Sequence, residues 1–223
     1  MTIEAVVALK TLSQSKRRLS AVLNDSQRCD LVEAMAQDVL SCLMTHPEID
    51  TVHAVCGEGW SRSAFPEGPL MVWQEAASEG GGLVAAYEMI AVKTAAERLL
   101  FIHADLPFLG QEDISALIAA SRDHHAVLSP DLIETGTNAV LRWRHQSLPL
   151  CFGEDSFARH QQAAKATETP WRVVRASGVE RDVDEPGDLG RLDGNDPRLG
   201  EATARWSADA GANVSLSATH RAC

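Results

Sequence analysis

The stretch that decides the fold is Leu99-Leu100-Phe101-Ile102-His103, and it is followed at once by Ala104-Asp105-Leu106-Pro107. A short, continuous apolar run of this kind is typical of a central strand in a parallel sheet, where both faces are buried. Ligands of open α/β sheets bind beyond the carboxyl ends of such strands. The carboxylate of Asp105 therefore stands where we expect a functional site.

Strand-like and helix-like segments alternate on both sides of this run. We expect strands at residues 4–9, 51–56, 70–73, 99–103, 126–129, 139–143 and 171–175, and helices at 25–44, 83–97, 111–121, 154–165 and 184–189. Asn24 and Gln27 form a plausible capping box at the start of the clearest helix. The alternation predicts a three-layer, Rossmann-like α/β fold with a mostly parallel mixed sheet.

The length of 223 residues fits one domain. Residues 191–223 contain few large apolar side chains, so we expect a domain over 1–190 and a flexible C-terminal tail over 191–223. The net charge of −11 argues against nucleic acid as a partner. Neither a membrane-spanning run nor a secretory signal is visible, which predicts a cytoplasmic protein without a membrane partner.

The first predicted loop carries a local positive charge within this acidic chain. Residues 1–20 contain Lys10, Lys16, Arg17 and Arg18 against the single acid Glu4, a balance of +3. The first loop after a strand commonly binds phosphate in this fold class. Lysine offers a point charge and arginine a bidentate fork for phosphate oxygens. We therefore expect an anionic small-molecule ligand here, the alternative being a solvated basic loop.

Two acidic positions complement the basic loop. Asp105 follows a buried strand, where an ionised carboxylate needs a partner. Asp182 and Asp184 alternate in a second acidic segment, so they point to one face if the chain is extended there. Magnesium is held by one or two carboxylates together with substrate phosphates. The combination suggests a metal-bridged triphosphate, whereas a helix cap or an ion pair with Arg98 would be the structural alternative for Asp105.

Three further segments could bind ligands, although ordinary turn and capping chemistry explains each of them as well. Gly80-Gly81-Gly82 precedes a predicted helix, residues 135–138 form a small polar loop, and residues 152–157 surround Ser156 at another helix start. Ser156 and His160 share a helix face, but no third orienting group accompanies them, so a nucleophile pair is disfavoured. His103 is expected to be a core histidine.

Six segments in register carry a family resemblance. They are Val-Ala-Leu-Lys10 with Lys16-Arg17-Arg18-Leu19, Gly81-Gly82-Leu83, His103-Ala104-Asp105-Leu106-Pro107, Thr135-Gly136-Thr137-Asn138, Phe152-Gly153 with Ser156-Phe157-Ala158-Arg159-His160, and Asp182-Val183-Asp184-Glu185-Pro186. In this order they resemble the CofC/FbiD family of guanylyltransferases in coenzyme F420 biosynthesis. The resemblance runs from about residue 4 to residue 190.

The resemblance implies a nucleotidyltransferase-type fold and a reaction between GTP and a small phosphorylated carboxylic acid that releases pyrophosphate. The acid would be phosphoenolpyruvate, 2-phospho-L-lactate or 3-phospho-D-glycerate. The residues that it implies are Lys10, Lys16, Arg18 and Asp105 for catalysis, Lys10, Lys16, Arg18, Gly81 and Gly82 for the nucleotide, Thr137, Gly153 and Ser156 for the acid, and Asp105 and Asp184 for Mg²⁺.

Two departures from the family pattern bear on substrate preference. Val84 stands where the family often has asparagine, and Glu134 replaces the first glycine of the loop before Asn138. A molybdenum-cofactor or sugar nucleotidylyltransferase of the same fold, or a non-catalytic nucleotide-binding module, therefore remains as an alternative. The oligomeric state stays open, a homodimer included.

Overall fold

A mixed sheet forms the centre of the computed structural model. Within residues 1–61, 64–74 and 82–219, which the structure describes, the sheet has seven strands in the order β3-β2-β1-β4-β6-β5-β7. They are β1 (Ile3–Leu9), β2 (Thr51–Cys56), β3 (Leu70–Gln74), β4 (Arg98–Ile102), β5 (Ala126–Pro130), β6 (Thr137–Trp143) and β7 (Trp171–Val173). The decisive apolar run is thus the central strand β4, as predicted.

Strand pairing is parallel except around β6. The pairs β1–β2, β1–β4, β2–β3 and β5–β7 are parallel. Strand β6 runs antiparallel to both β4 and β5. The mostly parallel mixed sheet is therefore confirmed. Because β6 is reversed, its first residues lie beside the carboxyl end of β4, and this brings Thr137 to the edge of the sheet that carries Asp105.

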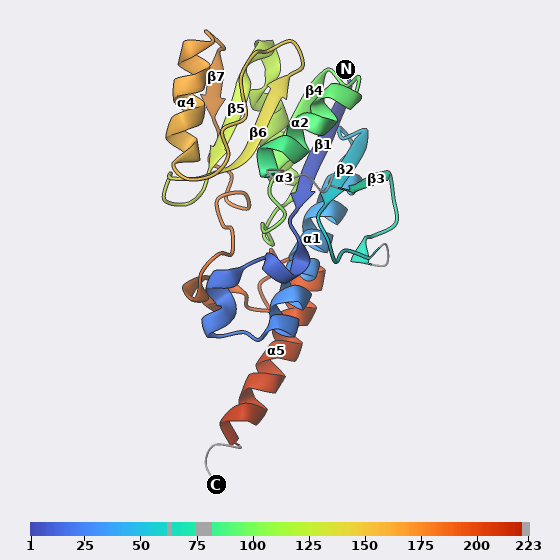
Figure 1. Cartoon of the computed structure of the whole chain (residues 1–223), viewed down its shortest axis with the longest axis vertical. Coiled ribbons are helices and arrows are strands. Elements are labelled where there is room, and N and C mark those ends of the chain that lie inside the picture. The colour runs from blue at the N-terminus through green and yellow to red at the C-terminus, as the bar shows by residue number, and fades with distance from the viewer. Residues whose placement is uncertain (62–63, 75–81, 220–223) are drawn as a thin grey trace.

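Helices cover both faces of the sheet and make three layers (Figure 1). They are α1 (Asp25–Thr45), α2 (Leu83–Lys93), α3 (Gln111–Ala120) and α4 (Ser156–Ala166). Successive residues of β1 face opposite sides, so Ala5 and Val7 pack with α1 and α3 while Val6 packs with α2 and α4. All of these residues are fully buried apolar side chains, which is why the strand sequences read as unbroken apolar runs.

The helix ends predicted from local sequence agree with the structure in some places and differ in others. Asn24 caps α1 in the expected capping box with Gln27. Helix α2 ends at Lys93 rather than near residue 97. The expected helix at 184–189 is the 3₁₀ helix η5 (Pro186–Arg191), and further 3₁₀ turns are η1 (Leu12–Gln14), η2 (Arg17–Ala21) and η4 (Arg122–His124). No helix within the described residues is both long and apolar enough to cross a membrane.

A separate apolar cluster, here called the loop core, lies beyond the carboxyl edge of the sheet. Its buried members are Leu12, Leu19, Leu23, Leu31, Val32, Met35, Phe108, Val183, Leu192 and Leu199. They come from the first loop, from α1, from the segment after Asp105, from the acidic segment around Asp184 and from the chain beyond residue 190. The loop core therefore fixes three chain segments that carry predicted site residues.

The chain beyond residue 190 also packs here. Leu192 and Leu199 are buried in the loop core, and a last helix, α5 (Glu201–Thr219), begins against α1 and extends away from the body (Figure 1). The Asp38 carboxylate on α1 accepts hydrogen bonds from the amides of Ala202 and Thr203 at 2.9 and 2.8 Å. Packed structure thus continues past residue 190, where the sequence placed the start of a flexible tail.

Candidate active site

The first loop is folded so that Lys16 points inward. Lys16 lies between η1 and η2 and has a left-handed backbone, with φ of 51°. The buried guanidinium of Arg28 on α1 donates to the carbonyl of Ser15 at 2.8 Å, which holds the adjoining backbone. Leu12 and Leu19 anchor the loop on either side in the loop core. As a result, the Lys16 side chain is only 9% exposed.

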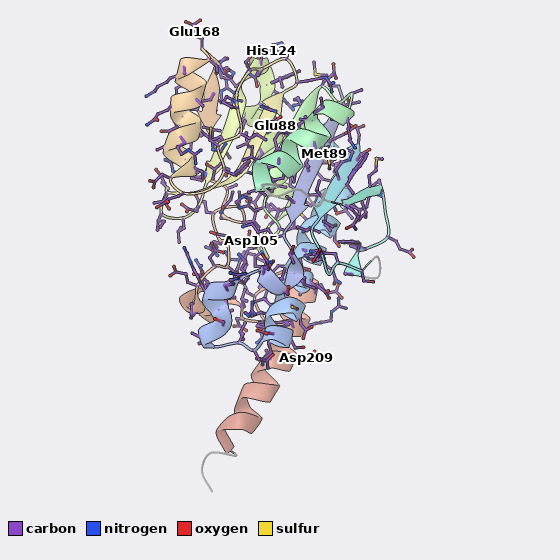
Figure 2. All side chains as sticks on the ribbon, viewed as in Figure 1. Glu88, Met89, Asp105, His124, Glu168 and Asp209 are labelled. Carbon is purple, nitrogen blue, oxygen red and sulfur yellow. The ribbon has the colours of Figure 1, made fainter. Side chains whose placement is uncertain are left out.

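The Lys16 ammonium joins the two acids that the sequence proposed as metal ligands. Its Nζ donates hydrogen bonds to Asp105 Oδ2 and to Asp184 Oδ1, two residues that lie far away in the chain. Asp105 is 23% exposed and Asp184 is 50% exposed. Figure 2 shows Asp105 between the sheet and the 3₁₀ turns of the first loop. Three predicted site residues thus form one cluster.

Burial and charge act in opposite directions in this cluster. Burial alone would lower the pKa of Lys16, but the charges of Asp105 and Asp184 outweigh it and raise that pKa. Burial would likewise raise the pKa of Asp105, but the charge and hydrogen bond of Lys16 hold it at about 2. The ammonium and the Asp105 carboxylate are therefore both ionised at neutral pH.

A third carboxylate, that of Asp182, is subject to the charges of this pair, and no ion pair involves it among the residues that the structure describes. Burial, together with the negative charges of Asp105 and Asp184, raises the pKa of Asp182 to about 6. The side-chain amide of Asn138 donates to Asp182 Oδ1 at 3.3 Å. The site consequently has more negative charge than the single Lys16 neutralises, and it favours the entry of a further cation.

The acidic segment is held by its own turn. The Asp188 carboxylate accepts hydrogen bonds from the amides of Asp184 and Glu185, both at 2.8 Å. The Arg191 guanidinium contacts Asp188 and also donates to the Asp182 carbonyl at 3.2 Å. Sequence reasoning missed Asp188 as a positioning residue, although Pro186-Gly187-Asp188 is a recognisable turn signal.

Two of the three residues predicted for the acid, Thr137 and Ser156, are in contact at the start of β6 and α4, and Gly153 lies three residues before Ser156 in the chain. The Thr137 amide donates to Ser156 Oγ at 2.8 Å. Gly153 has φ of 115°, a conformation that L side chains rarely adopt. These residues lie on the opposite side of β4 from the first loop. The sheet order thus divides the candidate site into a basic half, beside β1, and a polar half, beside β6.

His160 holds residues of the polar half of the site in place and does not act as a general base for Ser156. The amide of Cys151 donates to His160 Nε2 at 2.9 Å, so Nδ1 carries the proton. Nδ1 lies 2.8 Å from the Ser156 carbonyl and 3.1 Å from Thr137 Oγ1. Burial lowers the pKa of His160 to about 4, which keeps the ring neutral. The disfavoured Ser156–His160 nucleophile pair is absent from these contacts.

The remaining predicted residues lie at the rim. Lys10 is exposed at the end of β1, and its carbonyl accepts a hydrogen bond from Trp60 at 2.9 Å. Arg18 is 72% exposed and pairs with Glu185 at 3.3 Å, which links the basic loop to the acidic segment. Gly82 is the N-cap of α2, and a Cβ there would meet nothing within 4 Å. Gly81 falls outside the described residues.

The two departures from the family pattern have different surroundings. Glu134 has φ of 59° and forms an ion pair with Arg175 at 2.6 Å, so its charge is met locally. Val84 is partly buried and packs at the edge of the apolar cluster on the α2 side of the sheet. The structure therefore shows a partner for the extra negative charge of Glu134.

Comparison with known proteins identifies the family of the chain. The family model described as "Guanylyl transferase CofC like" matches residues 3–203. The chain belongs to this family. It is therefore a nucleotidyltransferase enzyme, as the resemblance implied.

Curated relatives cover most of the chain. A phosphoenolpyruvate guanylyltransferase of Sphaerobacter thermophilus is 34% identical over 88% of this chain and 95% of its own length. Its counterpart in Rubrobacter xylanophilus is 36% identical over 86% and 94%. A 3-phospho-D-glycerate guanylyltransferase of Phenylobacterium zucineum is 29% identical over 83% and 87%.

Solved structures of the same fold support the architecture of this CofC-family enzyme. A protein of Desulfovibrio desulfuricans G20, described as a nucleotide-diphospho-sugar transferase, superposes with a TM-score of 0.73 at 15% identity, over 94% of this chain and 96% of that one. A 4-diphosphocytidyl-2C-methyl-D-erythritol synthase of Anaerococcus prevotii gives 0.57 at 11% identity, over 84% and 92%. At these identities the likeness establishes the nucleotidyltransferase fold alone.

Proposed function

We propose that this enzyme joins GTP to a small phosphorylated carboxylic acid and releases pyrophosphate, as a step of coenzyme F420 biosynthesis. Relatives at 34% and 36% identity are named phosphoenolpyruvate guanylyltransferases, and one at 29% is named for 3-phospho-D-glycerate. Phosphoenolpyruvate is therefore the first acid to test. Small molecules would be its only substrates, and a cytoplasmic location is part of the proposal.

A single observation carries the proposal: one ammonium is held between two carboxylates at the carboxyl end of the central strand. This arrangement lies between the basic loop after β1 and the polar loop before β6. A nucleotide triphosphate on the first side and a phospho-acid on the second would meet beside Asp105. Charge neutralisation and positioning carry most of phosphoryl-type transfer.

The residues present fit a magnesium ion. Among the described residues there is no cluster of three or more metal-ligating side chains. Mg²⁺ is commonly bound by one or two protein carboxylates together with substrate phosphates. Asp105 and Asp184, which share the Lys16 ammonium, provide two such carboxylates. Asp105 and Asp184 would hold the ion, which when bound would supply positive charge against the triphosphate.

The chain's own residues have distinct roles in this proposal. Lys10, Lys16 and Arg18 bind the GTP phosphates and stabilise the departing pyrophosphate, and the amides near Gly81 and Gly82 receive the nucleotide. Thr137, Gly153 and Ser156 bind the acid.

The bond changes need no general base. A phosphate oxygen of the acid forms a bond to the α-phosphorus of GTP, and the bond from that phosphorus to the β-phosphate oxygen breaks. A phosphate dianion is already a nucleophile at neutral pH, so no side chain has to remove a proton. Pyrophosphate carries away the electron pair of the broken bond.

The test is pyrophosphate release by the full chain with Mg²⁺. Each of GTP, ATP, CTP and UTP is incubated with phosphoenolpyruvate, 2-phospho-L-lactate, 3-phospho-D-glycerate or, for comparison, a sugar 1-phosphate. We expect release with GTP and one of these acids. Turnover with CTP and a sugar phosphate alone would replace the proposal by the sugar-nucleotidyltransferase alternative.

A further inference from the structure

A buried histidine lies at the centre of the polar half of the site. The His160 side chain on α4 is fully buried, and the two residues that it joins, Thr137 and Ser156, are buried as well. The ring packs edge-on against Phe152, with 5.1 Å between the two ring centroids. The orientation of the ring is therefore fixed, and each of its nitrogens has a definite partner.

Two backbone contacts determine which ring nitrogen carries the proton. The Cys151 amide can only donate, so His160 Nε2, which lies 2.9 Å from it, accepts and has no proton. The Ser156 carbonyl can only accept, so Nδ1, which lies 2.8 Å from it, carries the proton and donates it. Burial lowers the pKa of His160 to about 4, so the ring stays neutral at neutral pH and keeps this tautomer.

This tautomer determines what the Thr137 hydroxyl can do. Thr137 Oγ1 lies 3.1 Å from His160 Nδ1. Because Nδ1 is protonated, the hydroxyl cannot donate to it, and only its oxygen can accept. Ser156 Oγ likewise accepts, from the Thr137 amide at 2.8 Å. A hydroxyl has one proton to donate, so each of these two hydroxyls still has its proton available.

The two hydroxyl protons have no acceptor within the part of the chain that the structure describes. There, the hydrogen bonds of Thr137 Oγ1 and Ser156 Oγ are those in which the oxygens accept. Buried polar groups nearly always have a partner in folded proteins. Ionised carboxylate and phosphate oxygens only accept hydrogen bonds, so they are the ligand groups that match two neighbouring donors.

We propose that His160 is a positioning residue, which fixes the Thr137 hydroxyl as a donor to an anionic oxygen of the phospho-acid. The inference rests on the proposed function and adds to it the reason why the polar half selects an anionic group. His160 itself touches no substrate. It acts through Thr137, and through the amide of Cys151, two residues before Gly153.

The first measurement determines the tautomer in the wild-type chain and needs no turnover. Long-range ¹H–¹⁵N NMR distinguishes a protonated from an unprotonated ring nitrogen by its chemical shift. We expect His160 at neutral pH to carry its proton on Nδ1 and none on Nε2. A ring protonated on Nε2 would overturn the inference, because Nδ1 could then accept the Thr137 proton.

Two amide variants each imitate one of the ring nitrogens. His160→Asn places an N–H near the position of Nδ1 and keeps the donor to Thr137, whereas His160→Gln places an oxygen near that of Nε2 and loses this donor. We expect His160→Gln to raise the KM for the phospho-acid that the wild type uses by about 10-fold and to leave the KM for GTP unchanged. His160→Asn should recover most of this loss.

The combination with Thr137→Val tests whether His160 acts through Thr137. In that background His160→Gln should raise the KM for the phospho-acid no further, because the hydroxyl that it positions is gone. Equal increases in the two amide variants, or an effect of His160→Gln that adds fully to that of Thr137→Val, would show that His160 only fills space beside Phe152. The inference is then overturned.

These outcomes are distinct from a failure of the proposed function. A wild type that releases no pyrophosphate from GTP with any of the acids refutes the proposed function, and the acid assigned to Thr137 fails with it. An active wild type whose variants do not follow the expected order refutes the role of His160 and leaves the proposed function standing.

Discussion

Lys16→Met tests the ion cluster most sharply, because methionine keeps an unbranched side chain and removes the ammonium group with its charge and its two hydrogen bonds. Removing one partner of a buried ion pair typically costs about 3–5 kcal/mol. Asp184 is half exposed, so water compensates part of the loss and we expect about 2–4 kcal/mol. For a chain of this size each kcal/mol corresponds to about 2–4 °C, so the melting temperature should fall by about 5–15 °C.

The pH dependence of this loss follows from Asp105. In the wild type its pKa is about 2, below the unfolded value of 3.8, so it contributes stability that is present above pH 3.8 and is lost as the pH falls towards 2. Without Lys16, burial dominates and raises the pKa of Asp105. The loss of unfolding free energy in Lys16→Met should therefore be largest at pH 8. It should be smaller at pH 5, where the Asp105 carboxyl of the variant begins to take up a proton.

Calorimetry at both pH values, with and without millimolar Mg²⁺, measures the effect. Mg²⁺ should raise the melting temperature of Lys16→Met more than that of the wild type, since both carboxylates are then free. Lys165→Met removes an exposed lysine of α4 and serves as the control. An equal loss at pH 5 and pH 8, with no extra effect of Mg²⁺, would refute the reasoning.

Further predictions concern residues around the cluster. The pKa of Asp182 is raised to about 6 from 3.8, so Asp182→Asn should stabilise the protein by up to about 3 kcal/mol at pH 8 and not below pH 3.8, as urea unfolding at the two pH values would show. Thr137→Val should raise the KM for the phospho-acid about 10-fold and leave that for GTP unchanged in steady-state assays; a rise for GTP alone would contradict the division of the site. Glu134→Gly relieves a left-handed backbone worth about 1 kcal/mol and loses only an exposed pair with Arg175, so the melting temperature should rise by about 2–4 °C. A fall by that amount would show that the ion pair matters more than the strain.

The sequence predicted those features that depend on local pattern. The apolar run before Asp105 identified the central strand, and the rule for carboxyl ends placed Asp105 at the site edge. Lys16 and Asp184 were chosen by charge and by resemblance, and the structure brings them together with Asp105. Their direct contact could not be foreseen, because the loop core that folds their segments together is built from distant residues.

Other features left little trace in the sequence. Arg28 holds the loop backbone from inside a helix, where an arginine is ordinarily a solvated surface residue. Helix α5 contacts α1 through Ala202 and Thr203, two small residues that a count of large apolar side chains overlooks. The reversed direction of β6 depends on pairing between strands that are far apart, so alternation alone could not show it.

One measurement tests the central claim most directly. Pyrophosphate release from GTP and phosphoenolpyruvate is compared between the wild type and Asp105→Asn, with Asp38→Asn as a partly buried carboxylate control outside the site. We expect Asp105→Asn to abolish turnover while its far-ultraviolet circular dichroism stays that of the wild type, and Asp38→Asn to remain active. Near-normal turnover in Asp105→Asn would contradict the assignment of this carboxylate to the reaction.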